Sequence, residues 1–280
     1  MSHGEFFPEP PLPDLDSFKA GDPERREMTD RPTVVITWMH TNEYSAPTTA
    51  YTLYASRPDL APYVNYICGN PDTAAKAPEE GFGETDLNRS FGSESLQNPK
   101  SYEEHRAKEI LAFVANARYV LDLHNTVCTN FGKVAIVDER RLNEPAVREI
   151  LAASPLDRIL LMSPEVADLC LLGRPEAPTI SFEYENELTE SEAVPDMLQT
   201  IENLVTNARP TPRKRAVFRM TGRILKTEDP GLHVKNWEAF TDRSGQTRIG
   251  TFLSTGPRSY REDPTKDYCG FYVTREELVL

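Results

Sequence analysis

The stretch Thr33-Val-Val-Ile-Thr-Trp-Met39 is an apolar, β-branched run that leads directly into His40-Thr-Asn-Glu43. A second such run, Tyr119-Val-Leu-Asp-Leu123, leads into His124. Runs of this length and composition are typical of buried strands. In open α/β sheets, functional sites form at the carboxyl ends of the strands. We therefore expect a strand before each histidine and a crevice that both strand ends share.

The rest of the first 208 residues supports an α/β fold. Short β-branched runs alternate with helical patterns, which is typical of a mixed, mainly parallel sheet flanked by helices. In the helix expected at 101–117, Ser101 and Glu104 predict a capping box. The expected strands are 33–39, 63–68, 119–123, 133–137, 157–162 and 178–184, and the expected helices are 46–56, 101–117, 144–153 and 190–207.

Composition divides the chain into three parts. Residues 1–30 are rich in Pro and charge, which favours an extended lead-in. Residues 31–208 form the expected α/β domain. From Arg209-Pro-Thr-Pro-Arg-Lys-Arg215 onward, short strands separated by turns predict a smaller β-rich domain at 209–280. We interpret the basic cluster Arg213-Lys-Arg215 as a solvated linker rather than as a nucleic-acid contact.

The net charge restricts the partners of the chain. Its 280 residues carry 44 acidic and 31 basic side chains, a formal charge of −13. Nucleic acids and anionic membranes need positive footprints, so neither is expected as a partner, and an anionic substrate needs a local basic pocket. No run of about eighteen apolar residues and no secretory leader is evident, and the four cysteines form no CxxC pair. These features predict a cytoplasmic protein, and they leave homo-oligomerisation open.

His40, Glu43 and His124 form a candidate metal site. His40 and Glu43 are three residues apart, so a helical turn there would let both side chains reach one ion. This spacing alone is common by chance, and His124 without it would be interpreted as a hydrogen-bonded core histidine. Two histidines and one glutamate match a zinc site that keeps one position open, which indicates hydrolysis rather than a structural metal.

A further candidate is the pair Asn88 and Arg89, in a Gly-flanked loop. An arginine fork binds a carboxylate through two hydrogen bonds, and the neighbouring amide adds another donor. From spacing alone, a surface ion pair or a turn is the default interpretation of this pair.

Three motifs together resemble a known family. His40-Thr-Asn-Glu43, then Asp86-Leu-Asn-Arg89 followed by Phe91, then Asp122-Leu-His-Asn-Thr126 occur in the order and approximate spacing of the aspartoacylase and succinylglutamate desuccinylase family. These enzymes are relatives of the zinc carboxypeptidases. The resemblance implies a zinc carboxypeptidase-like α/β fold whose β-rich C-terminal domain closes over a pocket for small substrates.

The resemblance also assigns roles to residues. It implies that His40, Glu43 and His124 bind one zinc ion and that Asn88 and Arg89 hold the substrate carboxylate. Glu183, in Thr179-Ile-Ser-Phe-Glu-Tyr-Glu185, matches the catalytic glutamate. Glu185 competes for this role, because side chains two apart on a strand share a face. Arg174 and Tyr272 match, more loosely, an arginine and a tyrosine that contact the substrate in the family.

The implied activity is zinc-dependent cleavage of the amide bond of a small, anionic N-acyl amino acid. Two alternatives stay open, a zinc carboxypeptidase that trims peptides and a catalytically weak protein that binds carboxylates. One departure bears on all three. The family arginine that polarises the scissile carbonyl lies just ahead of the Asp-Leu-Asn-Arg motif, where this chain reads Glu80-Gly-Phe-Gly-Glu-Thr85. Zinc, Lys76 or another arginine would have to replace it.

Overall fold

The structure is a computed structural model that describes residues 33–37, 39–40, 43, 52, 57–76, 83–126, 128, 130–174, 178–185, 192–208, 210–231, 234–253, 260 and 266–280. The predicted lead-in at 1–30 lies outside the described residues. The same holds for the helix predicted at 46–56, except Thr52. Among the helices that are described, none is both long and apolar enough to cross a membrane.

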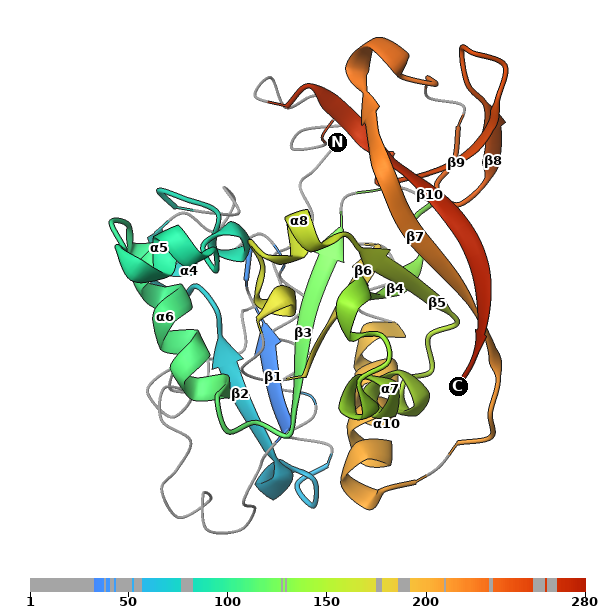
Figure 1. Ribbon diagram of the computed structural model, residues 1–280. Helices are drawn as coiled ribbons and strands as arrows, with labels where there is room; N and C mark the ends of the chain where they lie inside the picture. Colours follow the sequence, from blue (N-terminus) through green and yellow to red (C-terminus); the bar gives the residue numbers. More distant parts are fainter. Residues whose placement is uncertain are drawn as a thin grey trace, which may run out of the picture.

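A single sheet of ten strands runs through the molecule in the order β2-β1-β3-β6-β4-β5-β7-β10-β9-β8 (Figure 1). Five neighbouring pairs are parallel, and the pairs β6–β4, β7–β10, β10–β9 and β9–β8 are antiparallel. The predicted mixed, mainly parallel sheet is therefore confirmed. The strands are β1 (Thr33–Thr37), β2 (Val64–Cys68), β3 (Tyr119–Thr126), β4 (Lys133–Asp138), β5 (Arg158–Met162), β6 (Thr179–Glu185), β7 (Lys214–Leu225), β8 (Ala239–Thr241), β9 (Thr247–Thr251) and β10 (Tyr268–Val279).

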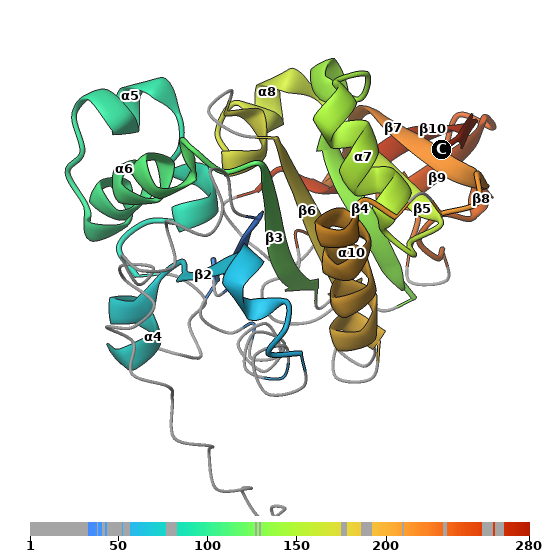
Figure 2. The ribbon, with the colours of Figure 1, turned by 90° about the horizontal axis from the view of Figure 1, so that it is seen from below.

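Helices cover both faces of the sheet (Figure 2). The α-helices are α4 (Pro71–Lys76), α5 (Ser93–Gln97), α6 (Tyr102–Val114), α7 (Pro145–Ala153), α8 (Pro164–Ala167) and α10 (Val194–Thr206). The 3-10 helices are η1 (Ala61–Tyr63), η2 (Leu87–Arg89), η3 (Glu139–Arg141), η4 (Leu171–Gly173) and η6 (Lys226–Glu228).

Alternation along the strands decides which helix each side chain meets. Val35 and Leu121 belong to the apolar cluster that also contains side chains of α7 and α10. Val34 and Val120, one position earlier, belong to the cluster that contains α6. Asp122 and His124 follow Val120 at intervals of two, so they lie on the α6 face.

Helix α6 begins at the predicted capping box. Ser101 Oγ accepts a hydrogen bond from Glu104 N at 3.2 Å, and the Glu104 carboxylate accepts one from Ser101 N at 3.1 Å. An apolar stripe of Ile110, Leu111 and Val114 is buried against the sheet. The helix therefore packs on the sheet and leads the chain into β3.

The basic cluster at 213–215 differs from the solvated linker that we predicted. Lys214 is exposed, but Arg215 is buried, and its guanidinium donates to the backbone carbonyls of Ser154 and Leu156. These carbonyls follow the end of α7, where helix carbonyls lack partners within the helix. The prediction is wrong for Arg215 because tertiary contact, not local composition, determines its burial.

Strand β7 begins within this cluster and connects the two predicted domains. It pairs with β5 through Ala216 to Arg219 and with β10 along almost its full length. Strands are present after residue 209 as predicted, but β7 and β10 have 12 residues each rather than being short. These strands extend the main sheet rather than form a separate one (Figure 1).

Candidate active site

The candidate metal ligands His40, Glu43 and His124, which we call the ligand triad, converge at the ends of two neighbouring strands. Strands β1 and β3 are parallel, with Ile36 opposite Asp122, so they deliver both histidines to the same edge of the sheet. Glu43 N donates to His40 O at 3.2 Å, a turn that returns the Glu43 carboxylate toward the imidazole. One potential ligand atom from each residue lies within 4.8 Å of the others.

The triad is oriented by carboxylates on its outer side. His40 Nδ1 and His124 Nδ1 lie 2.7 Å and 3.3 Å from Glu43 Oε1. His40 Nε2 lies 3.2 Å from Asp86 Oδ1, and His124 Nε2 lies 2.8 Å from Asp122 Oδ2. Metal-binding histidines commonly have such a carboxylate on the second ring nitrogen, which fixes the ring and its tautomer. Both Nδ1 atoms are thereby left to face a common point.

The charges of the triad also fit a bound cation. Burial lowers the pKa of His40, but Glu43 and Asp86 outweigh this effect and raise the pKa to about 10. Burial raises the pKa of Glu43, but the two imidazoles hold it at about 2. Glu43 Oε2 is buried and accepts no hydrogen bond from a described residue. Two nitrogens and one carboxylate are a ligand set that zinc uses, and a divalent cation would displace the imidazole protons.

Glu183 lies beside the triad. Strand β6 pairs with β3 so that Glu183 is opposite His124, and Glu183 lines the same cavity as His40 and His124. Burial raises the pKa of Glu183 to about 7, although His124 opposes the shift. Glu185 has another environment, because its carboxylate accepts hydrogen bonds from Asn130 N and Gly132 N at 2.9 Å each. The structure therefore places Glu183 in the cavity and Glu185 at a turn.

Asn88 and Arg89 line the same cavity, which has a volume of about 100 Å³. They lie in η2, whose N-cap is Asp86, and Asp86 Oδ1 accepts from Asn88 N at 2.8 Å. The same oxygen contacts His40, so one carboxylate connects this short helix to the ligand triad. Arg89 Nη1 donates to Asn88 O at 3.0 Å and to Cys170 Sγ at 3.1 Å.

The two looser candidates lie outside the residues that line this cavity. Arg174 Nη1 donates to Phe91 O at 3.3 Å. The Tyr272 ring stacks on Phe240 with centroids 6.4 Å apart, and the Arg248 guanidinium lies 5.4 Å from its centroid. The structure does not bring either residue to the ligand triad, and their predicted contacts with substrate stay predictions.

The tyrosine that does line the cavity is Tyr260. Burial raises its pKa, Arg89 opposes the shift, and Glu183 adds to it, so the phenol lies within electrostatic reach of both residues. Sequence analysis missed Tyr260 because it follows turn residues and carries no periodic signal. Asp122 was also missed as a partner of His124, although its position two residues earlier on the same strand face was a usable signal.

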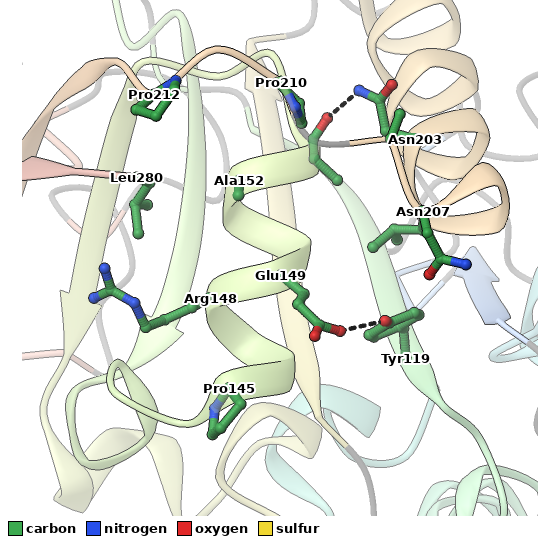
Figure 3. A pocket seen from close by; sticks show the side chains of 13 residues that line it. Tyr119, Pro145, Arg148, Glu149, Ala152, Asn203, Asn207, Pro210, Pro212 and Leu280 are labelled. Carbon is green, nitrogen blue, oxygen red and sulfur yellow. Dashed lines mark hydrogen bonds between the residues drawn. The ribbon is translucent and has the colours of Figure 1, made fainter.

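A larger cavity of about 420 Å³ lies elsewhere (Figure 3). Helix α7 and the end of α10 form its sides. Tyr119 donates to Glu149 there, and Asn203 Nδ2 donates to Ala153 O at 2.8 Å. Tyr119 is the first residue of β3, so this cavity is at the opposite end of that strand from His124. None of the triad residues line it, whereas His40 and His124 line the smaller cavity.

Comparison with known proteins agrees with the motifs. Residues 31–168 match the family model described as the succinylglutamate desuccinylase/aspartoacylase catalytic domain. Residues 31–168 are therefore similar to the catalytic domain of this family, which confirms the resemblance for that part of the chain. No curated protein sequence matches the chain.

Solved structures share the fold at low sequence identity. Murine aminoacylase 3 is 17% identical, with a TM-score of 0.62 over 89% of this chain and 97% of that one. Succinylglutamate desuccinylase from Chromobacterium violaceum is 16% identical, with a TM-score of 0.65 over 89% of this chain and 86% of that one. The ectoine utilization protein EutE from Ruegeria pomeroyi is 15% identical, with a TM-score of 0.51 over 89% and 82%.

Proposed function

We propose that the protein is a zinc-dependent hydrolase that cleaves the amide bond of a small N-acyl amino acid. One observation carries the proposal. A single cavity is lined by His40, His124, Glu183 and Arg89, and Glu43 lies against the two histidines. A metal site, a base and an anion-binding group are the parts that metal-assisted hydrolysis of an anionic amide requires. The match of residues 31–168 to the family's catalytic domain supports the same function.

Each of these residues has its own role in the proposed reaction. Zinc, when bound by the ligand triad, supplies a Lewis acid that polarises the amide carbonyl and makes water more acidic. Glu183 accepts a proton from the attacking water and returns it to the leaving nitrogen. Arg89 and Asn88 hold the substrate carboxylate, which fixes the amide in place. Tyr260, whose pKa is raised, stays protonated and can donate a hydrogen bond to the substrate.

Part of the stretch 80–85, which lacks the family arginine, is held in place by hydrogen bonds to Glu103. Gly83 N donates to Glu103 Oε1 at 3.1 Å, and Thr73 Oγ1 donates to the same oxygen at 3.0 Å. Glu103 is buried on α6, so the chain just before Asp86 is attached to this helix. Residues 77–82 and the side chain of Lys76 lie outside the described part of the chain. We propose that another group performs the task of the missing arginine.

The test is the release of free amine by the zinc-loaded protein from N-acetyl, N-formyl and N-succinyl amino acids and from short peptides. We expect cleavage of acyl amino acids and none of peptides, because a cavity of about 100 Å³ accepts a small substrate. Cleavage of peptides alone would identify a carboxypeptidase. If zinc is bound and no compound is cleaved, the protein is instead a carboxylate-binding member of the family.

A further inference from the structure

We propose that the substrate carries one carboxylate and that its remaining group is short and apolar, so that the protein prefers acetylated apolar amino acids to dicarboxylic substrates. This inference rests on the proposed function and specifies the substrate class of the same site. It follows from how polar and apolar side chains are distributed around the cavity.

The face of the sheet that bears the ligand triad changes character between β6 and β4. Asp122 of β3 lies opposite Ser181 of β6, which lies opposite Ile136 of β4. The same row continues through Leu160 of β5 to Phe218 of β7. The row is therefore polar on β3 and β6, beside the metal site, and apolar on the next three strands.

The cavity follows this division. Several apolar residues line it, and five of them that are buried form what we call the apolar wall. These residues are Ile136, Met162, Leu172, Met220 and Phe271. All five are buried and belong to one core cluster, so the wall is the side of a packed core. A carboxylate placed against such a surface would lose its hydration without gaining a partner, which is strongly unfavourable.

Cationic side chains are also distributed unevenly around the cavity. Arg89 is the one lysine or arginine among the described residues that line the cavity. Its hydrogen bonds to Cys170 and Asn88 orient it for a single carboxylate. Arg219, next to Met220 on β7, points away, because it pairs with Glu139 at 2.7 Å. The described part of the cavity thus provides for one anionic group, and a second would meet the apolar wall.

The size of the cavity limits the apolar group. A void of roughly 150 Å³ is enough to hold a benzene molecule. The cavity here has about 100 Å³, which suits an acetyl group and a short aliphatic side chain. The geometry does not assign the acyl group or the side chain to the wall, so the test varies both.

Four substrates vary the acyl group and the side chain separately. They are N-acetylnorvaline, N-acetylaspartate, N-succinylnorvaline and N-succinylaspartate. Norvaline resembles aspartate in length but carries no second charge. For the zinc-loaded protein we expect kcat/KM for N-acetylnorvaline to exceed that of each other compound at least about tenfold. If N-acetylaspartate or N-succinylnorvaline is cleaved as well or better, the inference is overturned and the proposed function stands. If none of the four is cleaved, this inference fails, and the proposed function fails with it only if the wider panel of acyl amino acids is not cleaved either.

A variant tests the wall directly. Met220→Arg places a cation on it and should raise the ratio of kcat/KM for N-acetylaspartate over N-acetylnorvaline at least about tenfold. Leu225→Arg is the matched control, since it adds the same charge to the exposed end of the same strand, and it should leave the ratio unchanged. Met220→Gln, a substitution of similar size, should lower the preference for N-acetylnorvaline if the arginine variant does not fold. An unchanged ratio in both folded Met220 variants contradicts the inference.

Discussion

The carboxylate of Asp122 lies 2.8 Å from Nε2 of His124, on the same face of the same strand. Ser181 Oγ donates to the same carboxylate oxygen at 3.1 Å. All three side chains are buried, so the contacts form in a region of low dielectric, where they are strong. Asp122 therefore acts on the proposed metal through His124, as a positioning residue.

Replacing Asp122 should weaken zinc binding without removing a ligand. We expect Asp122→Asn to lower zinc affinity about 10–100-fold, because an amide orients the imidazole less firmly and does not increase its basicity. Competition with a chromogenic chelator measures the affinity. Asp157→Asn changes a carboxylate that is exposed and distant from the triad, and it serves as the control. Equal affinities of the two variants would remove Asp122 from the site.

Replacing Glu183 and replacing Glu185 should have different effects. Glu183→Gln should lower kcat by about 10²–10⁴-fold and leave zinc bound, because it removes the base and keeps the shape. Glu185→Gln should keep kcat and lower the melting temperature, because it weakens the hydrogen bonds from Asn130 N and Gly132 N. Full turnover by the Glu183 variant would show that the base is another residue.

The proposed reaction should depend on pH through Glu183. Burial raises the pKa of this carboxyl to about 7, and only the ionised form accepts a proton. As the pH falls below 7 the protonated fraction grows, so kcat/KM should fall about tenfold per pH unit. The residual activity of Glu183→Gln should lack this limb. A wild-type profile that is flat between pH 5 and pH 8 would be incompatible with Glu183 as the base.

Arg89 should not be replaceable by lysine. Arg89→Lys keeps the charge and loses the fork that binds a carboxylate through two hydrogen bonds. We expect kcat/KM to fall about 10–100-fold, the effect of losing one charge-assisted hydrogen bond. Arg118→Lys, at an exposed ion pair with Glu149, should have no effect. Steady-state kinetics on the best substrate decide the matter, and an active Arg89→Lys variant would argue against a two-point contact.

Much of the fold was predictable because local patterns and tertiary structure agree. Strands β1 and β3 are buried on both faces, so they read as continuous apolar runs, and the capping box of α6 is a local device. The position of β4, antiparallel to β6 and parallel to β5, was not predictable, because chain order does not determine strand order. Tyr260 and Arg215 were missed for a similar reason, since contacts distant in sequence determine their environments.

Every residue of the apolar wall follows the ligand triad in the sequence, and two of them follow it by about a hundred residues or more. All three proposed ligands precede residue 125, whereas Met220 and Phe271 lie on strands that begin after residue 213. During synthesis, β1 and β3 can therefore pair and bring the ligands together before the wall is complete. An ion bound by the triad at that stage would be more open to water than in the finished protein. The last residue of the wall, Phe271, takes its place only when β10 pairs with β7.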